Sequence, residues 1–414
     1  MNILMLGPWL PTMRRQLATE RLHRFARELA REHRLTLACT TDHPNPFGAV
    51  SAVREEFEDL EFAVVPNRWK RLWSVAHLAT GSSAEVAYFS SDALRNRIRD
   101  RAKSAPFHLV YVASTSMIPY ALELAPRVPI VLDFGDVDSE WWQDRARRFS
   151  GIKTKIYRAE AMRLREVEIM GARRATHCLV ATPQAARTVA SFAPWAAVSV
   201  IGDGVDADEP AVPTRIGGPH LIAFTPCLEG NSEAQAAAEF CESVLSAVRT
   251  RVGRTKLLVG CKSHFRLAQR LADMPGVEVA APAGDLRPLL RRAAVAVAPR
   301  RFGAETRRSV LAAMAAGVPV ITTLDGLDGL PIKHGRELYL EDNALGFAER
   351  LIDLLRKPTL REVMGSRGRA FVRAHCSTVA EGARFSQVIE AAVNGNGISR
   401  NGSAPDGKGA GVIA

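Results

Sequence analysis

The sequence predicts an α/β protein built from two doubly wound domains, each a parallel sheet covered by helices on both faces. Short apolar, β-branched runs alternate with amphipathic helical stretches, which is typical of parallel strands joined by crossover helices. The alternation stops at the Pro- and Gly-rich stretch 206–219 and then starts again. The length of 414 residues suits two domains of ordinary size.

The first half supplies the first alternation. A buried strand is expected directly after Met1, and Gln16 to Glu32 carry apolar residues at helical spacing. Further strands are expected at 34–41, 60–66, 108–114, 129–135 and 176–182, and helical stretches around 72–79 and 90–103. The run 198–206 closes this half. We therefore place a first domain at 1–206.

The second half repeats the pattern after a linker at 207–219. Strands are expected at 220–226, 255–260, 277–282, 294–299 and 319–323, with a helix through Phe240 and Val248. A second domain then spans 220–393, and its last helix is a candidate to pack back on the first domain. The Gly-, Ser- and Asn-rich tail 394–414 is expected to be disordered.

The composition and the N-terminal sequence limit the possible partners and the expected cellular location. The formal net charge of +11 favours an anionic partner, which is a nucleotide phosphate, a nucleic acid or an acidic membrane face. The N-terminus lacks the basic region of a signal peptide, and no apolar run approaches the roughly 20 residues that span a bilayer. We expect a cytoplasmic protein that is soluble or attached peripherally at the inner face of the cell membrane.

Three aspartates lie at the end of the strand expected at 129–135: Asp133, Asp136 and Asp138. Carboxylates at the carboxyl end of a parallel strand are placed to accept hydrogen bonds from a ligand or to act as a base. Asp133 and Asp136 are our candidate catalytic residues. The alternative for this turn is helix capping, with Asp138 or Ser139 as the N-cap of the next helix.

A basic loop, 300–309, follows the strand expected at 294–299 and precedes a helix. It carries Arg300, Arg301, Arg307 and Arg308. Guanidinium groups beside a helix N-terminus suit a nucleoside diphosphate, and solvated surface charges are the alternative. Gly204, in a turn just before the linker, is expected to adopt a positive φ or to allow a close backbone approach.

Two further stretches combine charge with apolar residues. The segment 67–73, NRWKRLW, has the basic and aromatic composition of a membrane interface, although single-stranded nucleic acid or an ordinary surface helix would also suit it. No other nucleic-acid motif is present, so we expect no nucleic-acid partner. The helix expected at 154–174 reads as a long, mostly exposed connector whose Glu160 and Glu168 pair with nearby arginines.

The order of motifs resembles a known family. The matching stretches are VLDFGDVDSEWW, RAEAMRLREVE, VSVIGDGVD, GVEVAAPAGDLRPLL, AVAVAPRR, VLAAMAAGVPVITT and HGRELYLEDN, and they cover most of 1–393. The chain resembles GT-B glycosyltransferases of family four (group 1), and more narrowly the sugar transferases associated with PEP-CTERM and exopolysaccharide systems. The resemblance implies two Rossmann-like domains that face a cleft.

The resemblance also implies a reaction. A sugar would move from a nucleotide-sugar donor to a polysaccharide or lipid-linked glycan, with retention of configuration and without a metal or cofactor. The second domain would bind most of the donor. Our candidate donor-binding residues are Lys262, Arg301, Glu305, Arg307 and Arg308, together with Gly204 in the turn just before the linker. The first domain would bind the acceptor, with Ser114 and Ser139 on the acceptor side. An anionic membrane surface is a further possible partner.

The chain departs from the family pattern at the donor site. Ala312 stands where the family usually has a glutamate for the donor ribose, and Ser309 stands where lysine is common. Pro226 replaces an expected glycine, and the turn after the first strand contains no glycine. Two alternatives therefore accompany the transferase: a catalytically inactive GT-B homologue that acts as a binding partner in glycan assembly, and a GT-B sugar-nucleotide epimerase.

Overall fold

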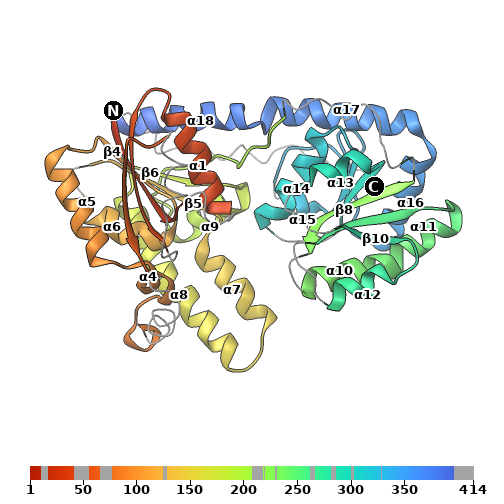
Figure 1. The fold of residues 1–414 in the computed structure, drawn as a ribbon, viewed down its shortest axis with the longest axis horizontal. Helices are drawn as coiled ribbons and strands as arrows, with labels where there is room; N and C mark the ends of the chain where they lie inside the picture. The colour runs from red at the N-terminus through yellow and green to blue at the C-terminus, as the bar shows by residue number, and fades with distance from the viewer. Residues whose placement is uncertain are drawn as a thin grey trace. The chain divides into compact units, whose positions relative to one another are not determined.

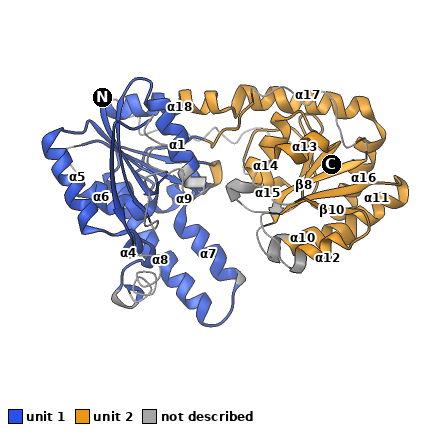
Figure 2. Cartoon of the chain, viewed as in Figure 1, with its two compact units in different colours: residues 1–181, 185–201, 384–414 blue, residues 182–184, 202–383 orange. Residues whose placement is uncertain are grey.

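The computed structural model describes residues 1–10, 17–41, 56–65, 77–124, 128–207, 218, 220–228, 231–261, 266–280, 286–299, 303–327 and 329–395 (Figure 1). The chain divides into two compact units (Figure 2). Unit 1 comprises Met1–Ala181, Ala185–Ile201 and Arg384–Ala414, and unit 2 comprises Thr182–Gln184 and Gly202–Ala383.

Unit 1 contains a parallel sheet of seven strands in the order β3-β2-β1-β4-β5-β6-β7. The strands are β1 (Asn2–Trp9), β2 (Arg34–Thr41), β3 (Asp59–Val64), β4 (Leu109–Val112), β5 (Ile130–Gly135), β6 (His177–Val180) and β7 (Val198–Val200). The helices of this half are α1 (Leu17–Leu29), η1 (His77–Thr80), α4 (Ala84–Phe89), α5 (Asp92–Ser104), η2 (Thr115–Met117), α6 (Ile118–Leu122), α7 (Asp138–Arg148), α8 (Ile152–Arg174) and α9 (Pro183–Phe192).

The sheet of unit 1 is buried on both faces because successive residues of its strands point to opposite sides. In β1, Ile3 and Met5 lie in one core cluster and Leu4 and Leu6 in another. The first cluster includes α1 and also Phe385 of α18 (Thr378–Val393), which stacks on Phe25 with ring centroids 3.9 Å apart. The second part of α18 therefore completes the core of unit 1.

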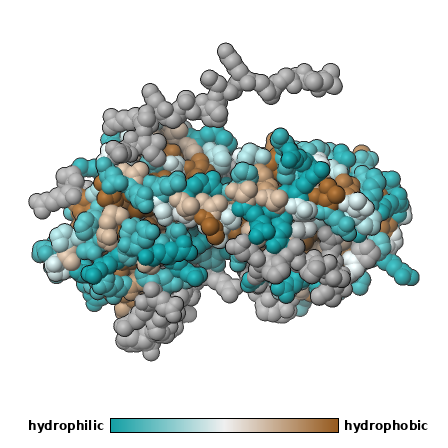
Figure 3. All heavy atoms as spheres, turned by 90° about the horizontal axis from the view of Figure 1, so that it is seen from above, coloured by the Kyte–Doolittle hydropathy of each residue, from teal (hydrophilic) through white to brown (hydrophobic). Residues whose placement is uncertain are grey.

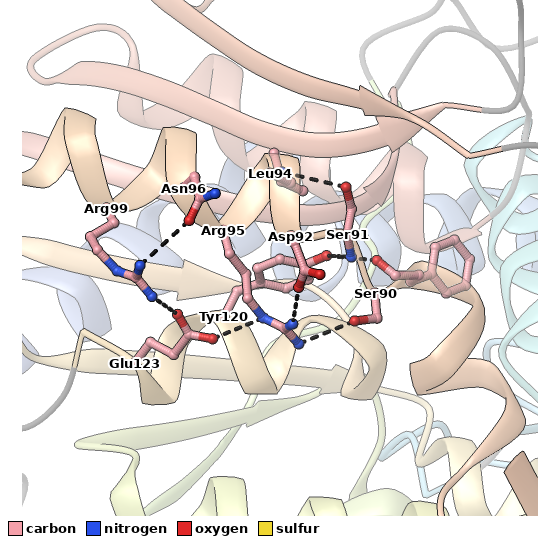
Figure 4. Close-up of polar contacts among 10 residues, drawn as sticks. Ser90, Ser91, Asp92, Leu94, Arg95, Asn96, Arg99, Tyr120 and Glu123 are labelled. Atoms are coloured by element: carbon pink, nitrogen blue, oxygen red, sulfur yellow. Dashed lines mark hydrogen bonds and ion pairs between the residues drawn. The ribbon is translucent and has the colours of Figure 1, made fainter.

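Polar contacts fix the start of α5 and tie it to α6 (Figure 4). The Ser91 side chain accepts a hydrogen bond from the Leu94 amide and caps the helix. Arg95 pairs with Asp92 one turn earlier and with Glu123, which follows α6. The basic residues of α5 thus have acidic neighbours.

Unit 2 contains a second parallel sheet, of six strands in the order β10-β9-β8-β11-β12-β13. The strands are β8 (Leu221–Leu228), β9 (Lys256–Cys261), β10 (Val277–Ala280), β11 (Val295–Ala298), β12 (Val320–Thr322) and β13 (Tyr339–Leu340). The helices are α10 (Asn231–Phe240), the π-helical η3 (Cys241–Leu245), α11 (Ser246–Arg251), α12 (Arg266–Ala272), α13 (Arg287–Arg292), α14 (Gly303–Ala315), α15 (Leu324–Leu327), α16 (Ala344–Arg356) and α17 (Pro358–His375). The expectation of two doubly wound α/β domains is confirmed.

The long helix α8 differs from its expectation. Its residues Glu160, Ala161, Leu164, Glu168, Gly171 and Ala172 are buried. A Cβ added to Gly171 would lie 2.7 Å from Ile118 and 2.9 Å from Leu132, so the helix approaches α6 and β5 closely. The prediction of a mostly exposed connector is therefore wrong for this face of α8, which packs against unit 1.

The described part of the face drawn in Figure 3 is mainly polar. In Figure 3 hydrophilic residues cover most of the described face, and hydrophobic residues lie among them singly or in small groups. Among the described residues, no helix has the length and apolar character needed to cross a membrane.

Candidate active site

In unit 1, acidic and hydroxyl side chains gather where β4 and β5 end. The Thr115 amide donates to Asp138 Oδ2 over 3.2 Å, and the Thr115 hydroxyl lies 3.4 Å from Glu168 Oε1. The Ser139 amide donates to the same Glu168 oxygen over 2.9 Å, and the Ser139 hydroxyl donates to Oε2. Glu168 thus joins the ends of two neighbouring strands.

Glu168 also explains how α7 begins. Val137 occupies the N-cap of α7 without a side-chain hydrogen bond, so the alternative that Asp138 or Ser139 is the N-cap is wrong. The Glu168 carboxylate of α8 instead accepts from the first turn, where helix amides are otherwise unsatisfied. Arg165 donates to both Glu168 and Ser139, which confirms the expected pairing of Glu168 with an arginine.

Glu160, eight residues earlier on α8, caps α4 in the same manner. Its carboxylate accepts from the Ser83 hydroxyl at 2.7 Å, the Ala84 amide at 2.8 Å and the Glu85 amide at 2.9 Å. The partners found for Glu160 are therefore the helix start rather than an arginine. This brings the Glu85 side chain close to the other acids, and Glu85 Oε2 accepts from the Trp142 indole over 3.0 Å.

Burial, more than neighbouring charge, raises the pKa values of three of these carboxyl groups. Burial raises the pKa of Glu85 to about 7, and the charges of Glu160 and Glu168 add to the shift while the Trp142 hydrogen bond opposes it. Burial, followed by the charges of Glu85 and Glu168, raises the pKa of Asp138 well above its usual value. Burial also raises the pKa of Glu168, against the hydrogen bonds from Ser139 and Arg165. We call Glu85, Asp138 and Glu168 the acid cluster.

The acid cluster is partly open to a ligand. Glu168 is fully buried, whereas Glu85 and Asp138 are half-buried and keep some exposed surface. Because like charges this close oppose joint ionisation, the cluster holds protons at a pH where isolated carboxyls have lost them. Its oxygens can accept hydrogen bonds from hydroxyl groups, and a protonated member can donate one.

The predicted catalytic and acceptor-side residues lie at this edge but in different surroundings. Asp133 is buried, pairs with Arg21 at 2.7 Å, and accepts from the Tyr111 hydroxyl and the Gly135 amide. Asp136 is exposed. Ser114 caps η2 and Ser139 is buried against Glu168. The catalytic roles of Asp133 and Asp136 stay predictions.

In unit 2, the loop 202–205 is fixed against the end of α17 and the start of α18. The Val205 amide donates to the Cys376 carbonyl, the Thr378 amide donates to the Val205 carbonyl, and the Gly202 amide donates to Glu381 Oε2 at 2.9 Å. Gly204 has a φ of 63°, and a Cβ there would meet the Thr378 backbone at 2.9 Å. Both expectations for the Gly204 backbone are confirmed.

Arg307 of α14 lies beside this loop. A Cβ added to Gly202 would lie 3.0 Å from Arg307 Nη2 and 2.7 Å from Glu381 Oε1, so the guanidinium and the carboxylate flank the glycine. Arg307 is buried and Arg308 is half-buried. Arg301, Lys262 and the segment 67–73 lie outside the described residues, as does the side chain of Glu305.

The two family departures on α14 have local explanations. The Ser309 hydroxyl is buried, donates to the Thr306 carbonyl at 2.8 Å and lies 3.3 Å from the Thr225 hydroxyl of β8. Ala312 is half-buried and packs against a hydrophobic core of unit 2. Sequence reasoning singled out Asp138 and Glu168 but missed Glu85, Glu381 and the contacts that gather the acid cluster, because the spacing of acids along one helix does not reveal which distant helix start they cap.

Comparison with known proteins gives the same architecture. Residues 221–357 match the family model described as glycosyl transferases group 1. The solved structure of Anabaena Alr3699/HepE in complex with UDP is 16% identical, covers 94% of this chain and 100% of its own, and has a TM-score of 0.63. Sucrose-phosphate synthase from Thermosynechococcus elongatus is 12% identical, with coverages of 94% and 98% and a TM-score of 0.64.

A third solved structure adds a glycan-bound example. A mutant of TarM from S. aureus, in complex with fondaparinux, alpha-GlcNAc-glycerol and UDP, is 10% identical, with coverages of 94% and 99% and a TM-score of 0.64. Among curated protein sequences, none matches this chain. These likenesses extend over nearly the whole chain and confirm the fold class predicted from the sequence. The chain has the GT-B fold, and its residues 221–357 match the glycosyl transferases group 1 family model.

Proposed function

We propose that this protein is a glycosyltransferase that moves a sugar from a nucleotide-sugar donor to a polysaccharide or lipid-linked glycan acceptor. The observation that carries the proposal is the Arg307 guanidinium beside the loop 202–205, within the unit that matches the group 1 family. The solved structures with UDP and with glycans on the same fold support both substrate classes.

The donor side belongs to unit 2. Arg307 lies in the second turn of α14, and a helix N-terminus favours anions because its amide groups and dipole present positive charge. A guanidinium at this place can pair with the donor diphosphate and stabilise the charge that develops on it as the sugar leaves. The glycines of the loop 202–205 allow a close backbone approach.

The acceptor side belongs to unit 1. Asp138 is the member of the acid cluster that lies at the end of β5 and keeps some exposed surface. When it is ionised, the Asp138 carboxylate can orient an acceptor hydroxyl, and its raised pKa makes it a stronger base for that hydroxyl's proton as the new glycosidic bond forms and the nucleoside diphosphate leaves. We assign this role to Asp138, and we expect retention of configuration and no dependence on a metal, so a chelator should leave the rate unchanged.

Arg307 gives the direct test of the donor site. Replacing Arg307 with Ala should weaken binding of UDP- or GDP-sugars by about 1.5–3 kcal/mol, because a hydrogen bond to a charged group is lost. The affinity of Arg307→Lys should lie between those of the wild type and Arg307→Ala, because lysine keeps the charge without the planar guanidinium. Arg336→Ala, at an exposed arginine of unit 2, is the control and should bind as the wild type does.

Isothermal titration calorimetry on variants with unchanged melting temperatures measures these affinities. Equal affinity in wild type and Arg307→Ala would remove Arg307 from the site. No binding of any nucleotide sugar by the wild type would overturn the transferase and favour an inactive homologue, for which the missing glutamate at Ala312 is the motive. Turnover assays distinguish a transferase from an epimerase. Transfer or hydrolysis of the sugar supports the transferase, and isomerisation of the sugar without an acceptor identifies an epimerase.

A further inference from the structure

The hairpin of α7 and α8 has a tip with an unusual composition. The two helices pack against each other, and their connecting loop lies away from the sheet of unit 1 (Figure 1). The tip consists of Phe149, Ser150, Gly151 and Ile152. Gly151 turns the chain with a φ of 71°, and a Cβ there would meet no atom within 4 Å.

Large apolar side chains at this tip face solvent. Ile152 is 74% exposed and Phe149 is 41% exposed, and Trp141 of α7 is 52% exposed. Single exposed apolar residues are ordinary on protein surfaces. Here Phe149 and Ile152 both occupy the turn of one hairpin, so the two side chains can insert into an apolar phase together.

The apolar tip is surrounded by positive charge. Residues 145–159 contain six basic residues and no acidic residue, the basic ones being Arg145, Arg147, Arg148, Lys153, Lys155 and Arg158. Lys153 and Lys155 are exposed. On α5, by contrast, Arg95, Arg101 and Lys103 pair with nearby acids, as Figure 4 shows for Arg95. Asp144 and Glu160 border the stretch 145–159, and Glu160 is engaged at the start of α4, so the acids nearest in sequence lie at the base of the basic stretch and not at the tip.

Aromatic contacts hold the tip in shape. The Phe149 ring lies 5.5 Å from the Tyr157 ring, and Tyr157 lies 5.3 Å from Trp142. The Arg145 guanidinium lies 4.5 Å above the Trp141 ring. An ordered tip loses little conformational entropy when it binds, so its exposed side chains are ready to insert.

We propose that the tip of the α7–α8 hairpin docks on an anionic phospholipid membrane. Phe149 and Ile152 enter the boundary between headgroups and acyl chains, and the exposed Arg147, Lys153, Lys155 and Arg158 meet the lipid phosphates. Charge complementarity favours this partner, because the apolar tip suits the apolar phase of a membrane and the six cations of the same hairpin suit an anionic surface. The inference does not depend on the sugar-transfer reaction.

Vesicle co-sedimentation tests the proposal with the full chain. We expect binding to vesicles that contain phosphatidylglycerol, weaker binding to phosphatidylcholine alone, and a decrease with salt, because ionic screening shortens the reach of the charges. Lys153→Gln with Lys155→Gln should lower the partition coefficient about 30-fold, since each cation near an anionic surface contributes about 1 kcal/mol. Phe149→Ser with Ile152→Ser should lower it at least about tenfold.

Matched variants serve as controls. Lys103→Gln with Arg31→Gln removes two equally exposed cations elsewhere in unit 1, and Leu345→Ser with Val379→Ser removes two exposed apolar side chains; both should bind as the wild type does. Hydrogen exchange on the wild type gives a second measurement that needs no variant. Peptides that cover 145–159 should be protected by anionic vesicles.

Three results would overturn the proposal. One is equal partitioning of wild type and both hairpin variants. Another is binding that survives in the hairpin variants but is lost when Trp69 and Trp73 are replaced, which would move the contact to 67–73. The third is hairpin-dependent binding to a single-stranded oligonucleotide or an acidic protein at least as tight as binding to vesicles, which would make the tip a general polyanion site.

Discussion

At the scale of single residues, the acids of unit 1 differ in what their neighbours do to their charge. Asp133 is buried beside Arg21, and its oxygens accept hydrogen bonds from Tyr111 and Gly135, so its ionised form is well compensated. Asp138 and Glu85 lie among other carboxylates. The contacts of Asp133 are typical of a structural ion pair. The protonated carboxyl groups of the acid cluster suit a site that binds hydroxyl groups.

The raised pKa of Glu85 predicts how stability depends on pH. Below its unfolded pKa of 4.5 the side chain is protonated in both states; between 4.5 and about 7 the unfolded chain ionises first. The wild type should therefore lose stability as pH rises through this window, because the unfolded state then binds fewer protons than the folded state. The glutamine of Glu85→Gln does not titrate, so the melting temperature of this variant should rise relative to that of the wild type between pH 4.5 and about 7.

Thermal unfolding across this pH range measures the effect. Glu166→Gln is the control, because Glu166 is an exposed acid on α8, 58% accessible, that pairs with Arg163. Its curve should follow the wild type at every pH. If Glu85→Gln also runs parallel to the wild type, the acid cluster does not hold the proton that we assign to it.

At the scale of elements, α8 organises unit 1 by capping two other helices. Glu160 satisfies the start of α4 and Glu168 the start of α7, so one helix orders two segments that follow different strands. β4 and β5 are paired neighbours in the sheet, and Glu168 contacts Thr115 and Ser139, which follow them, so the acid cluster is positioned at the ends of these two strands. The hairpin that α8 forms with α7 carries the exposed tip at its other end.

Glu160 should therefore matter far more than its neighbours on the same helix. Glu160→Ala removes three hydrogen bonds at the buried start of α4 and should destabilise the protein by about 2–4 kcal/mol, as expected for a lost cap with unsatisfied donors. Glu166→Ala, on the exposed face, should cost less than about 0.5 kcal/mol. Urea unfolding measures both, and equal costs would show that the capping contacts do not stabilise α4.

Much of each element can be predicted from sequence, and the exceptions share a cause. The buried strands appear as apolar runs between helices, so the expected bounds of β1, β2 and β5 lie close to the observed ones. The burial of the two α8 glutamates is not predictable in this way, because a charged residue at helical spacing is ordinarily on the surface. Such burial becomes favourable only when a distant helix start supplies the hydrogen bonds.

The candidate site is predictable to a similar depth. The turn at Gly204 and the arginine beside a helix start follow from local chemistry, and both have the expected backbone setting. Local spacing favours Asp138 and Ser139 as cap residues, a role that neither has in the structure. Their partner Glu168 comes 29 residues after Ser139, and nothing in the intervening sequence marks the contact.

At the scale of the whole molecule, the chain leaves unit 1 at Ile201 and returns to it at Arg384. The residues that return are few, but Phe385, Val388 and Ile389 are buried in the core that holds Ile3 and Met5. Folding of unit 1 therefore requires residues from the far end of the described chain. Contacts of such large sequence separation are costly to close and are expected to form late in folding.

Replacing Phe385 tests how strongly unit 1 depends on the residues of α18. Its ring is fully buried, stacks on Phe25 at 3.9 Å and lies 5.6 Å from Tyr111, so Phe385→Ala should destabilise unit 1 by about 3–5 kcal/mol. Val379→Ala, on the exposed face of the same helix, is the control and should be nearly neutral. Hydrogen exchange distinguishes the units: amides of β1 and β4 should exchange faster in Phe385→Ala, while those of β9 and β11 keep their wild-type rates. Equal acceleration in both sheets would mean that the units unfold as one, and unchanged rates in β1 and β4 would remove α18 from the core of unit 1.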